Sequence, residues 1–376
     1  MNLPDTLADW PWPRQFNPYT EEATIESNIW FKSLGIYSPE SQKVWNKCHY
    51  GLLCGLAYPD VSKGGVTFRG HRAFDCVDLP TSSSLDDVRA GIDLMQALFT
   101  LDEFTDVAPA PMVREIATVV MDALCNPDTP RPAGEIILGE MMSQFAACVF
   151  HTATPEANKH FLTSMEVLMN SFVAEAEDRD NHTIRSIESY FELRRGTIGM
   201  GPSYFIGELH LSIPDEALYH PVVRELEYLA ADMIALDNDI ASYNREQGTG
   251  NDQHNIITVV IHHLGLNLDS AVEWAADYHK DAQRRFSDTM KLVPSFGPAV
   301  DRDLDTYIQR IAMWVRGNYC WLFEGGRYFG SRGAEYQKTR RVPLLPKRKR
   351  NSGEPTVTVE VASIDELGWA AVGLDG

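Results

Sequence analysis

Helical periodicity runs through most of this 376-residue sequence and constrains its fold more than any other feature. Apolar residues recur every three to four positions, in segments separated by short groups of Pro, Gly, Asn and Asp. Few segments alternate between apolar and polar residues as β-strands do, and no internal repeat is found. We therefore expect an all-α, single-domain fold. The expected helices span residues 21–58, 88–107, 112–125, 133–153, 155–180, 183–198, 216–246, 252–263, 267–290 and 298–328.

Three segments depart from this helical pattern. Prolines fix the backbone in residues 1–20, so this segment is expected to be an extended arm whose residues Trp10 and Trp12 pack on the body. Residues 62–84, rich in Gly and Ser, are interpreted as a loop insertion. Residues 331–376 contain prolines and a basic run and are interpreted as a flexible tail. We therefore expect residues 1–330 to form the single domain.

The composition excludes several classes of partner. With 33 Lys and Arg against 53 Asp and Glu, the formal charge is −20, which argues against nucleic-acid binding and against adsorption to anionic membranes. No run of 18 apolar residues is present, so no stable membrane insertion is expected. The start of the chain lacks the character of a signal peptide. Six cysteines without a Cys-x-x-Cys pair, such as Cys54 and Cys148 in apolar surroundings, indicate reduced core thiols in a cytoplasmic protein.

A first cluster of carboxylates closes the apolar helix predicted over residues 88–107. Asp102 and Asp106 are four residues apart and share one helix face, with Glu103 beside them. Like charges at this spacing repel, and acids at a helix C-terminus oppose the helix dipole. A hard cation such as Mg²⁺ would relieve both costs, since it binds carboxylate oxygens and substrate phosphates. The alternative is an acidic turn that faces solvent.

A second cluster lies on the helix predicted over residues 216–246. Asn238, Ser242 and Glu246 follow each other at intervals of four residues. Each step turns about 40° beyond a full helical turn, so the three oxygen donors line one stripe. Amide, hydroxyl and carboxylate oxygens together suit one Mg²⁺ ion. The alternative is a polar stripe on a surface helix.

Together the two clusters resemble the motifs of the class I terpene cyclases, and specifically of the fungal sesquiterpene synthases. The first is similar to the aspartate-rich motif of that family, and the second to its Asn-x-x-x-Ser-x-x-x-Glu motif. The segment around Arg194 resembles the one that carries the diphosphate-sensing arginine. Arg327 and Tyr328 resemble the C-terminal Arg-Tyr pair. The four motifs occur in family order over residues 1–330, which the resemblance identifies as a terpene synthase catalytic domain.

The resemblance implies a helical bundle of the class I terpenoid synthase type with a central active-site cavity, present as a monomer or homodimer. It implies three Mg²⁺ ions, two held by Asp102 with Asp106 or Glu103, and one held by the second cluster. It also implies diphosphate binding by side chains that donate hydrogen bonds, namely Arg194, Arg245, Arg327 and Tyr328. Catalysis is expected to depend on Asp102, Arg194, Arg327 and Tyr328.

The implied reaction is the ionisation of farnesyl diphosphate, followed by cyclisation of the carbocation to a sesquiterpene hydrocarbon. The resemblance favours 1,11-closure through a humulyl-type cation, as in a protoilludene-like product. Ring faces attract cations, so an aromatic cavity suits this chemistry. The candidate cavity residues are Phe99, Thr197, Ile198 and Trp321.

Two other functions remain as alternatives. A prenyl diphosphate synthase would share the first motif and the metal ions, but it would carry a second aspartate-rich motif, which is not visible here. A non-catalytic helical binding protein could retain the same fold. Against it, every expected ligand position holds a residue with a suitable oxygen donor.

Overall fold

The computed structural model describes residues 1–61 and 87–346. Within these ranges the chain is built from helices, and the one strand-like contact is an isolated bridge between Asn2 and Arg341. The prediction of an all-α fold is therefore confirmed. The helices are Thr20–Ser33 (α1), Pro39–Asn46 (α2), Tyr50–Ala57 (α3), Asp87–Val107 (α4), Ala110–Cys125 (α5), Ile137–Val149 (α6), Pro155–Asp180 (α7), Ile187–Thr197 (α8), Met200–Glu208 (α9), Asp215–Leu218 (α10), Pro221–Thr249 (α11), Ile256–Leu264 (α12), Leu268–Met290 (α13), Pro298–Glu324 (α14), the 3₁₀ helix Gly330–Arg332 (η1) and Gly333–Thr339 (α15).

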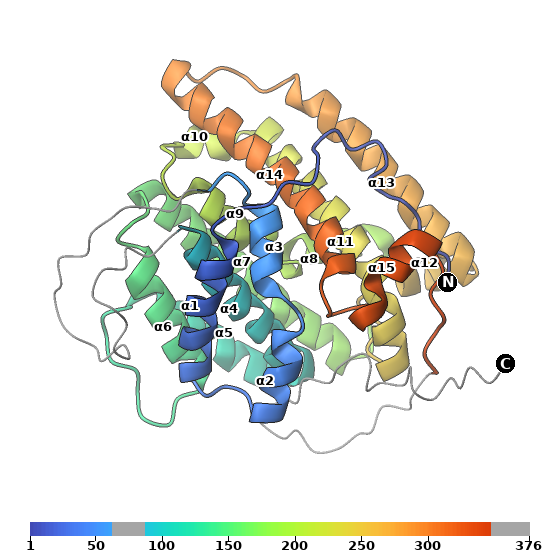
Figure 1. Cartoon of the computed structure of the whole chain (residues 1–376), viewed down its shortest axis with the longest axis horizontal. Helices are drawn as coiled ribbons and strands as arrows, with labels where there is room; N and C mark the ends of the chain where they lie inside the picture. The colour runs from blue at the N-terminus through green and yellow to red at the C-terminus, as the bar shows by residue number, and fades with distance from the viewer. Residues whose placement is uncertain (62–86, 347–376) are drawn as a thin grey trace.

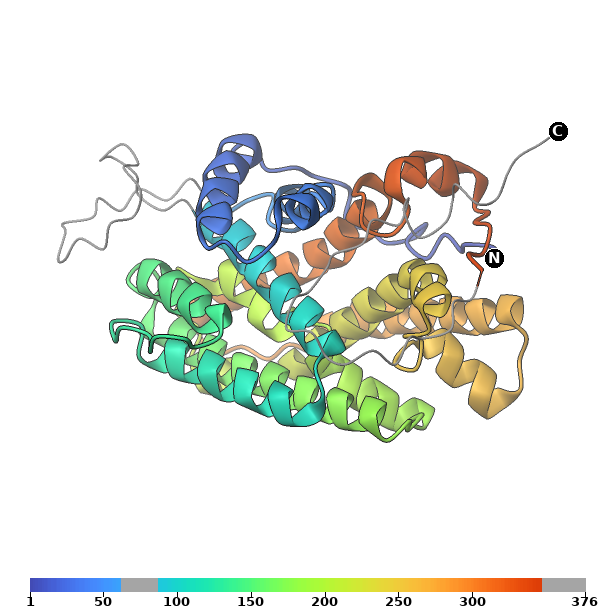
Figure 2. The same ribbon diagram turned by 90° about the horizontal axis from the view of Figure 1, so that it is seen from below.

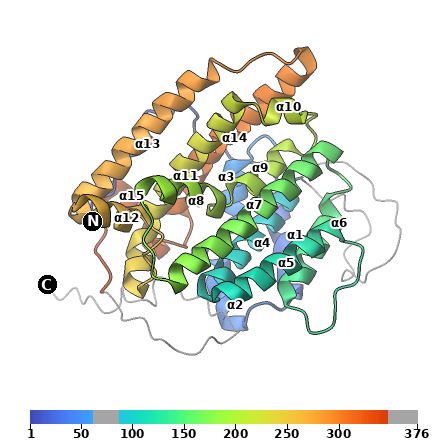
Figure 3. The same cartoon turned by 180° about the vertical axis from the view of Figure 1, so that it is seen from behind.

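Helices α4 and α11 form the centre of the bundle. Both are buried on most of their faces, as expected of helices that are surrounded by others. Seen from below, the cyan helix α4 runs between the blue N-terminal helices and the green helices α5 to α8 (Figure 2). Helix α11 packs against α13, α14, α8 and α12. Figure 1 shows α3 and α14 on the near side, and Figure 3 shows α5 and α7 on the opposite side. The two helices that carry the predicted motifs are thus held from all sides.

The segment predicted as one helical stretch over residues 21–58 is divided into α1, α2 and α3. Gly35 has a φ of 62°, in the left-handed region that glycine reaches without strain. Ser38 then caps α2 by accepting a hydrogen bond from Ser41, with Pro39 in the first turn. His49, with a φ of 53°, separates α2 from α3. These two breaks fold the N-terminal helices back on one another.

The N-terminal arm packs on the body as predicted. Trp10 and Trp12 contact the ring of Phe286 on α13, with ring centroids 5.3 and 5.9 Å away. Arg316 on α14 donates hydrogen bonds of 2.8 to 3.0 Å to the main-chain carbonyls of Leu7, Trp10 and Trp12. The arm is therefore fixed by edge-to-face contacts of its rings and by hydrogen bonds to its main-chain carbonyls.

The prediction of a flexible tail from residue 331 is wrong for residues 331–346. Helices η1 and α15 occupy the first part of this segment. Val342 then donates a main-chain hydrogen bond to Met1, and Leu3 donates one to Arg340. The packed body therefore extends to residue 346, because residues 340–342 pair with the start of the chain and Leu345 bonds to Asn244 and Gln247 on α11. Residues 347–376 and the predicted insertion at 62–84 lie outside the described residues.

The structure also bears on the positions of the cysteines and on the search for membrane-spanning helices. Cys48, Cys54 and Cys320 are buried, whereas Cys125 and Cys148 are exposed, so the prediction of a core position is wrong for Cys125 and Cys148. Within residues 1–61 and 87–346, no helix combines the length and the apolar character needed to cross a bilayer.

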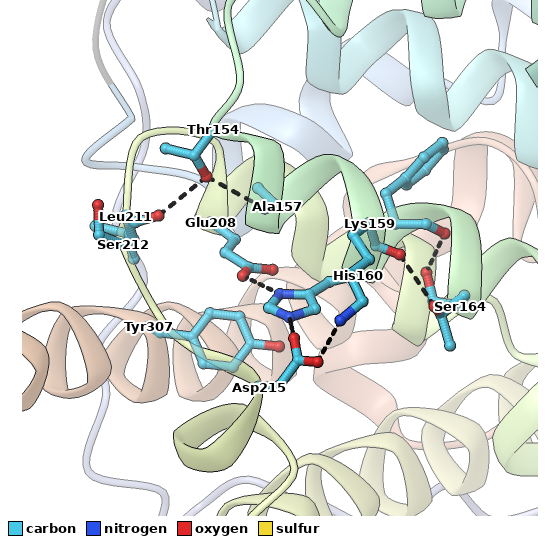
Figure 4. Close-up of polar contacts among 12 residues, drawn as sticks. Thr154, Ala157, Lys159, His160, Ser164, Glu208, Leu211, Ser212, Asp215 and Tyr307 are labelled. Atoms are coloured by element: carbon cyan, nitrogen blue, oxygen red, sulfur yellow. Dashed lines mark hydrogen bonds and ion pairs between the residues drawn. The ribbon is translucent and has the colours of Figure 1, made fainter. Parts of the chain in front are cut away.

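A polar cluster with a buried centre, His160 and Glu208, and an exposed edge, Lys159 and Asp215, joins α7 to α9 and α10 (Figure 4). His160 on α7 contacts Glu208 through Nδ1 at 2.6 Å and Asp215 through Nε2 at 3.0 Å. Lys159 forms an ion pair with the same Asp215. Burial lowers the pKa of His160, but hydrogen bonds and charge attraction from the two carboxylates outweigh burial and raise the pKa above its usual value. The two carboxylates therefore favour the protonated imidazole, in which both nitrogens can donate.

Candidate active site

The first acidic cluster lies at the C-terminal end of α4, and its three carboxylates do not point the same way. Asp102 and Asp106 are partly exposed, whereas Glu103 is buried. Glu103 Oε1 lies 2.9 Å from Nη1 of Arg327 and 3.6 Å from Nη2 of Arg245. Successive residues of a helix differ by about 100° in direction. Asp102 and Asp106 therefore share the open face, and Glu103 faces the two arginines.

The pKa values of these three carboxylates are shifted in different directions. Burial raises the pKa of Asp102 to about 6; Arg327 opposes this rise and the charge of Glu103 adds to it. The pKa of Asp106 is raised well above its usual value, first by burial and then by the charge of Asp102. Burial would also raise the pKa of Glu103, but Arg327 and Arg245 hold it below its usual value. Asp102 keeps one contact of 3.4 Å with Nη2 of Arg327, which also pairs with Glu103, so the charges of Asp102 and Asp106 are compensated less than the charge of Glu103.

The second cluster lines α11 as the spacing predicted. Ser242 is buried, and Asn238 and Glu246 are partly exposed. Burial raises the pKa of Glu246 to about 7, and the charge of Asp239 adds to the rise, while hydrogen bonds with Ser242 and Asn255 lower it. Glu246 therefore carries a charge that its protein neighbours stabilise only in part.

Two contacts join the clusters of α4 and α11. Arg245, which follows the second cluster on α11, forms the 3.6 Å contact with Glu103 on α4. Arg327 Nε donates a hydrogen bond of 3.3 Å to the Tyr328 hydroxyl, which in turn accepts one of 2.9 Å from Nδ2 of Asn238. The C-terminal Arg-Tyr pair thus bridges the two metal-binding motifs predicted from the sequence.

Arg194 reaches the same region from α8. Its Nη2 donates hydrogen bonds of 2.9 Å to Oδ1 of Asp239 and to Oδ1 of Asn238. The adjacent Arg195 instead forms a bidentate pair with Asp232, at 2.7 and 2.8 Å. Of the two neighbouring arginines, Arg194 is therefore the one that contacts the second cluster.

Aromatic rings pack beneath the arginine of the C-terminal pair. The Arg327 guanidinium carbon lies 4.9 Å from the centre of the Phe99 ring. Phe99 stacks on Tyr50 at 4.5 Å and lies 5.5 Å from Trp321. Trp321 is 1% exposed and donates its indole N–H to a main-chain carbonyl at 2.8 Å. Phe99 therefore contacts a site residue directly, and Trp321 belongs to the core that supports it.

Thr197 and Ile198 end helix α8 next to Arg194. The Thr197 hydroxyl lies 3.4 Å from Nη1 of Arg194, and Ile198 is the C-cap residue of the helix. Gly199 follows with a φ of 73°, which ends α8 and starts α9. The end of α8 thus places the Thr197 hydroxyl beside Arg194, with Ile198 as the next residue.

Known terpene synthases match this chain along most of its length. The family model described as "Terpene synthase family 2, C-terminal metal binding" matches residues 93–285. Sesquiterpene synthase 14 of Postia placenta is 47% identical over 363 residues, which cover 96% of this chain and 97% of that protein. The chain belongs to the terpene synthase family.

Further relatives of this terpene synthase agree in sequence or in fold. Delta(6)-protoilludene synthase 18 of Postia placenta is 43% identical over 364 residues, covering 97% of this chain and 98% of that protein. The solved structure of hedycaryol synthase in complex with HEPES superposes with a TM-score of 0.69 at 18% identity, covering 85% of this chain and 98% of that one. The structural likeness concerns the fold, which is that of the class I terpene synthases.

Some residues of this terpene synthase site lie outside the motifs that were found in the sequence. Glu175 on α7 adds negative charge that raises the pKa of Asp102 and Asp106. Asp239 binds Arg194, and Asn255 binds Glu246. Asp239 could have been found from the sequence, because it directly follows Asn238, the first residue of the second cluster. Glu175 and Asn255 act across helices, so sequence spacing gives no signal for them.

The donors of this terpene synthase fit hard divalent cations. Both clusters present oxygen atoms, which Mg²⁺ prefers, and their carboxylates have the uncompensated charge that a cation would stabilise. In the described part of the chain, no three His, Cys, Asp or Glu side chains are gathered closely enough to hold a metal by themselves. Such sparse sites suit ions that share their coordination with substrate oxygens and water.

Proposed function

We propose that this terpene synthase is a Mg²⁺-dependent sesquiterpene cyclase that ionises farnesyl diphosphate. The observation that carries the proposal is the joining of two oxygen-rich clusters, on α4 and α11, by arginines that can bind phosphate. The relatives named as sesquiterpene and protoilludene synthases support the substrate class.

Two groups of residues are proposed to hold the metal ions. Asp102 and Asp106 would hold two ions, and Asn238, Ser242 and Glu246 would hold the third. When bound, Mg²⁺ supplies positive charge that stabilises the departing diphosphate. Glu103 is less suited to be a ligand than Asp106, because it is already paired with two arginines.

The arginines are proposed to exchange partners when the substrate binds. Arg194 and Arg327 are now paired with protein oxygens on Asp239 and Glu103. Phosphate oxygens accept hydrogen bonds from the same guanidinium forks, and Arg245 and Tyr328 are placed to donate to them as well. These donors would bind and orient the leaving group and stabilise its charge as the C–O bond breaks.

The proposed product is a 1,11-cyclised sesquiterpene of the protoilludene type. This part rests on the names of the relatives, several of which are Delta(6)-protoilludene synthases. Phe99, Thr197 and Ile198 are the proposed residues that shape and stabilise the cation, with Trp321 in support. A monomeric or homodimeric enzyme in the cytoplasm is the proposed setting.

The decisive experiment incubates the purified chain with farnesyl diphosphate and Mg²⁺, with and without isopentenyl diphosphate, and analyses volatile and diphosphate products. A cyclic C15 hydrocarbon is expected in both mixtures. A lengthened diphosphate would indicate a prenyl diphosphate synthase instead. Binding of substrate without turnover would indicate the non-catalytic alternative.

A further inference from the structure

Asn255 lies immediately before α12 and is completely buried. Its Nδ2 donates hydrogen bonds of 2.9 Å to Oε2 of Glu246 and 2.8 Å to the main-chain carbonyl of Asp239, and it lies 3.4 Å from Oγ of Ser242. Its Oδ1 accepts a hydrogen bond of 3.0 Å from the main-chain N–H of Ile257. One carboxamide therefore contacts two members of the α11 cluster and the first turn of α12.

The residue after Asn255 strengthens the same connection. The main-chain N–H of Ile256 donates a hydrogen bond of 2.8 Å to Oδ2 of Asp239, whose Oδ1 accepts from Arg194. The start of α12 is thus attached to α11 at the level of the Asn238–Glu246 stripe. The cap of one helix and the orientation of the donors on another depend on the same pair of residues.

We propose that Asn255 is a positioning residue for the metal-binding stripe of α11. Its two amide hydrogens hold the carboxylate of Glu246 and the main-chain carbonyl of Asp239 in place beside the Ser242 hydroxyl, while its oxygen caps α12. A hydrogen bond to one oxygen of a carboxylate leaves further lone pairs available for an ion. This inference rests on the proposed function, because it assigns Asn255 to the site of the third ion.

The chemistry of a carboxamide explains why this position needs Asn. Asp caps a helix as well as Asn does, but it has no hydrogen to donate to Glu246 and would place a like charge beside it. Thr also caps helices, but its shorter hydroxyl cannot bridge to Glu246 and Ile257 together. The two substitutions therefore separate the cap from the positioning contact.

Three variants test the inference: Asn255→Asp, Asn255→Thr and the control Asn267→Asp. Asn267 caps α13 by accepting a hydrogen bond from Ser270, and it is exposed. Binding of Mg²⁺ with inorganic diphosphate is measured by calorimetry, and turnover of farnesyl diphosphate is measured across Mg²⁺ concentrations. Circular dichroism reports the fold of each variant.

Loss of a contact that orients a metal ligand lowers metal affinity or activity on the order of 10- to 100-fold. We expect that loss in both Asn255 variants, with helix content unchanged and with part of the activity of Asn255→Thr recovered at high Mg²⁺. Asn267→Asp should match the wild type. Wild-type affinity and Mg²⁺ dependence in both Asn255 variants would overturn the inference. So would loss of the fold in both variants, because it would assign Asn255 to folding alone.

The two proposals fail in different ways. A wild-type chain that binds Mg²⁺ with inorganic diphosphate but does not convert farnesyl diphosphate would refute the proposed function. The calorimetric comparison of the Asn255 variants would still decide the role of Asn255.

Discussion

Two groups of carboxylates in this terpene synthase differ in what compensates their charge. In the cluster around His160, Glu208 and Asp215 contact the same imidazole, and Lys159 also pairs with Asp215 (Figure 4). In the α4 and α11 motifs, burial raises the pKa of Asp102 and of Glu246, and their protein neighbours offset this rise only in part. The first cluster has cationic partners within the protein, whereas the second is proposed to gain cations from outside.

The comparison distinguishes carboxylates that stabilise the fold from carboxylates that are suited to bind a ligand. A buried carboxylate that has its cation nearby ties elements together, as Glu208 ties α9 to α7. A carboxylate whose charge is balanced only in part makes the ligand-free fold less stable, and such costs are typical of sites that bind ligands. Removing a carboxylate should therefore have opposite consequences at the two places.

The largest effect is expected for Asp102→Asn. Loss of this carboxylate should lower kcat/KM on the order of 10²- to 10³-fold, as for other groups that stabilise charge in a transition state. The melting temperature should stay equal or rise, because the repulsion of Asp106 is removed. Steady-state kinetics and thermal melts measure both. Near-normal turnover would remove Asp102 from the proposed site.

The second prediction concerns added ligand. Mg²⁺ with inorganic diphosphate, at about 100 times its dissociation constant, should stabilise the wild type by about 2.7 kcal/mol. The Glu246→Gln variant should lose much of this gain, while Glu208→Gln should retain it fully. Melts with and without the two additives make the comparison. Equal gains in the two variants would contradict the distinction between the clusters.

The third prediction is a variant that loses stability but keeps its activity. Glu208 is 2% exposed, so Glu208→Gln should lower the free energy of unfolding by about 1–3 kcal/mol because it weakens a buried charged contact to His160. Turnover per folded molecule should be unchanged. Denaturant unfolding measures the loss, and Glu216→Gln on the exposed side of α10 serves as the control, with no expected change.

The sequence predicted which oxygen donors of α4 and α11 share a helix face, and it gave no sign of the cluster around His160. Asp102 and Asp106 share a helix face because of their spacing, and so do Asn238 and Glu246, since the periodicity of one helix decides such contacts. Contacts between helices are different. His160, Glu208 and Asp215 lie on three helices, and their meeting depends on packing that no local pattern encodes.

The same reason explains the other errors. Helix α15 and residues 341–346 were predicted as part of a flexible tail, because this segment is held by residues far away in the sequence: Val342 pairs with Met1, and Leu345 bonds to Asn244 on α11. His49 was missed as a break because non-glycine residues seldom adopt a positive φ. Asn255 was not singled out, because the partner of its amide group, Glu246, lies on the preceding helix.

The smallest expected effect is the pH dependence of the structural cluster. The pKa of His160 is raised above its usual value of 6.5, so the contribution of the imidazolium to stability is fully present below about pH 6.5. It is then lost as pH rises through the raised pKa of the folded state, because the folded protein binds the proton more tightly than the unfolded chain. The effect should be smaller than that of Glu208→Gln, since only the proton leaves and the ring can still donate one hydrogen bond. Urea unfolding from pH 6 to 9 measures the slope, and subtracting the curve of His160→Gln removes the contribution of other groups. A difference curve that stays flat, or that rises with pH, would mean that the two carboxylates do not hold His160 as a cation.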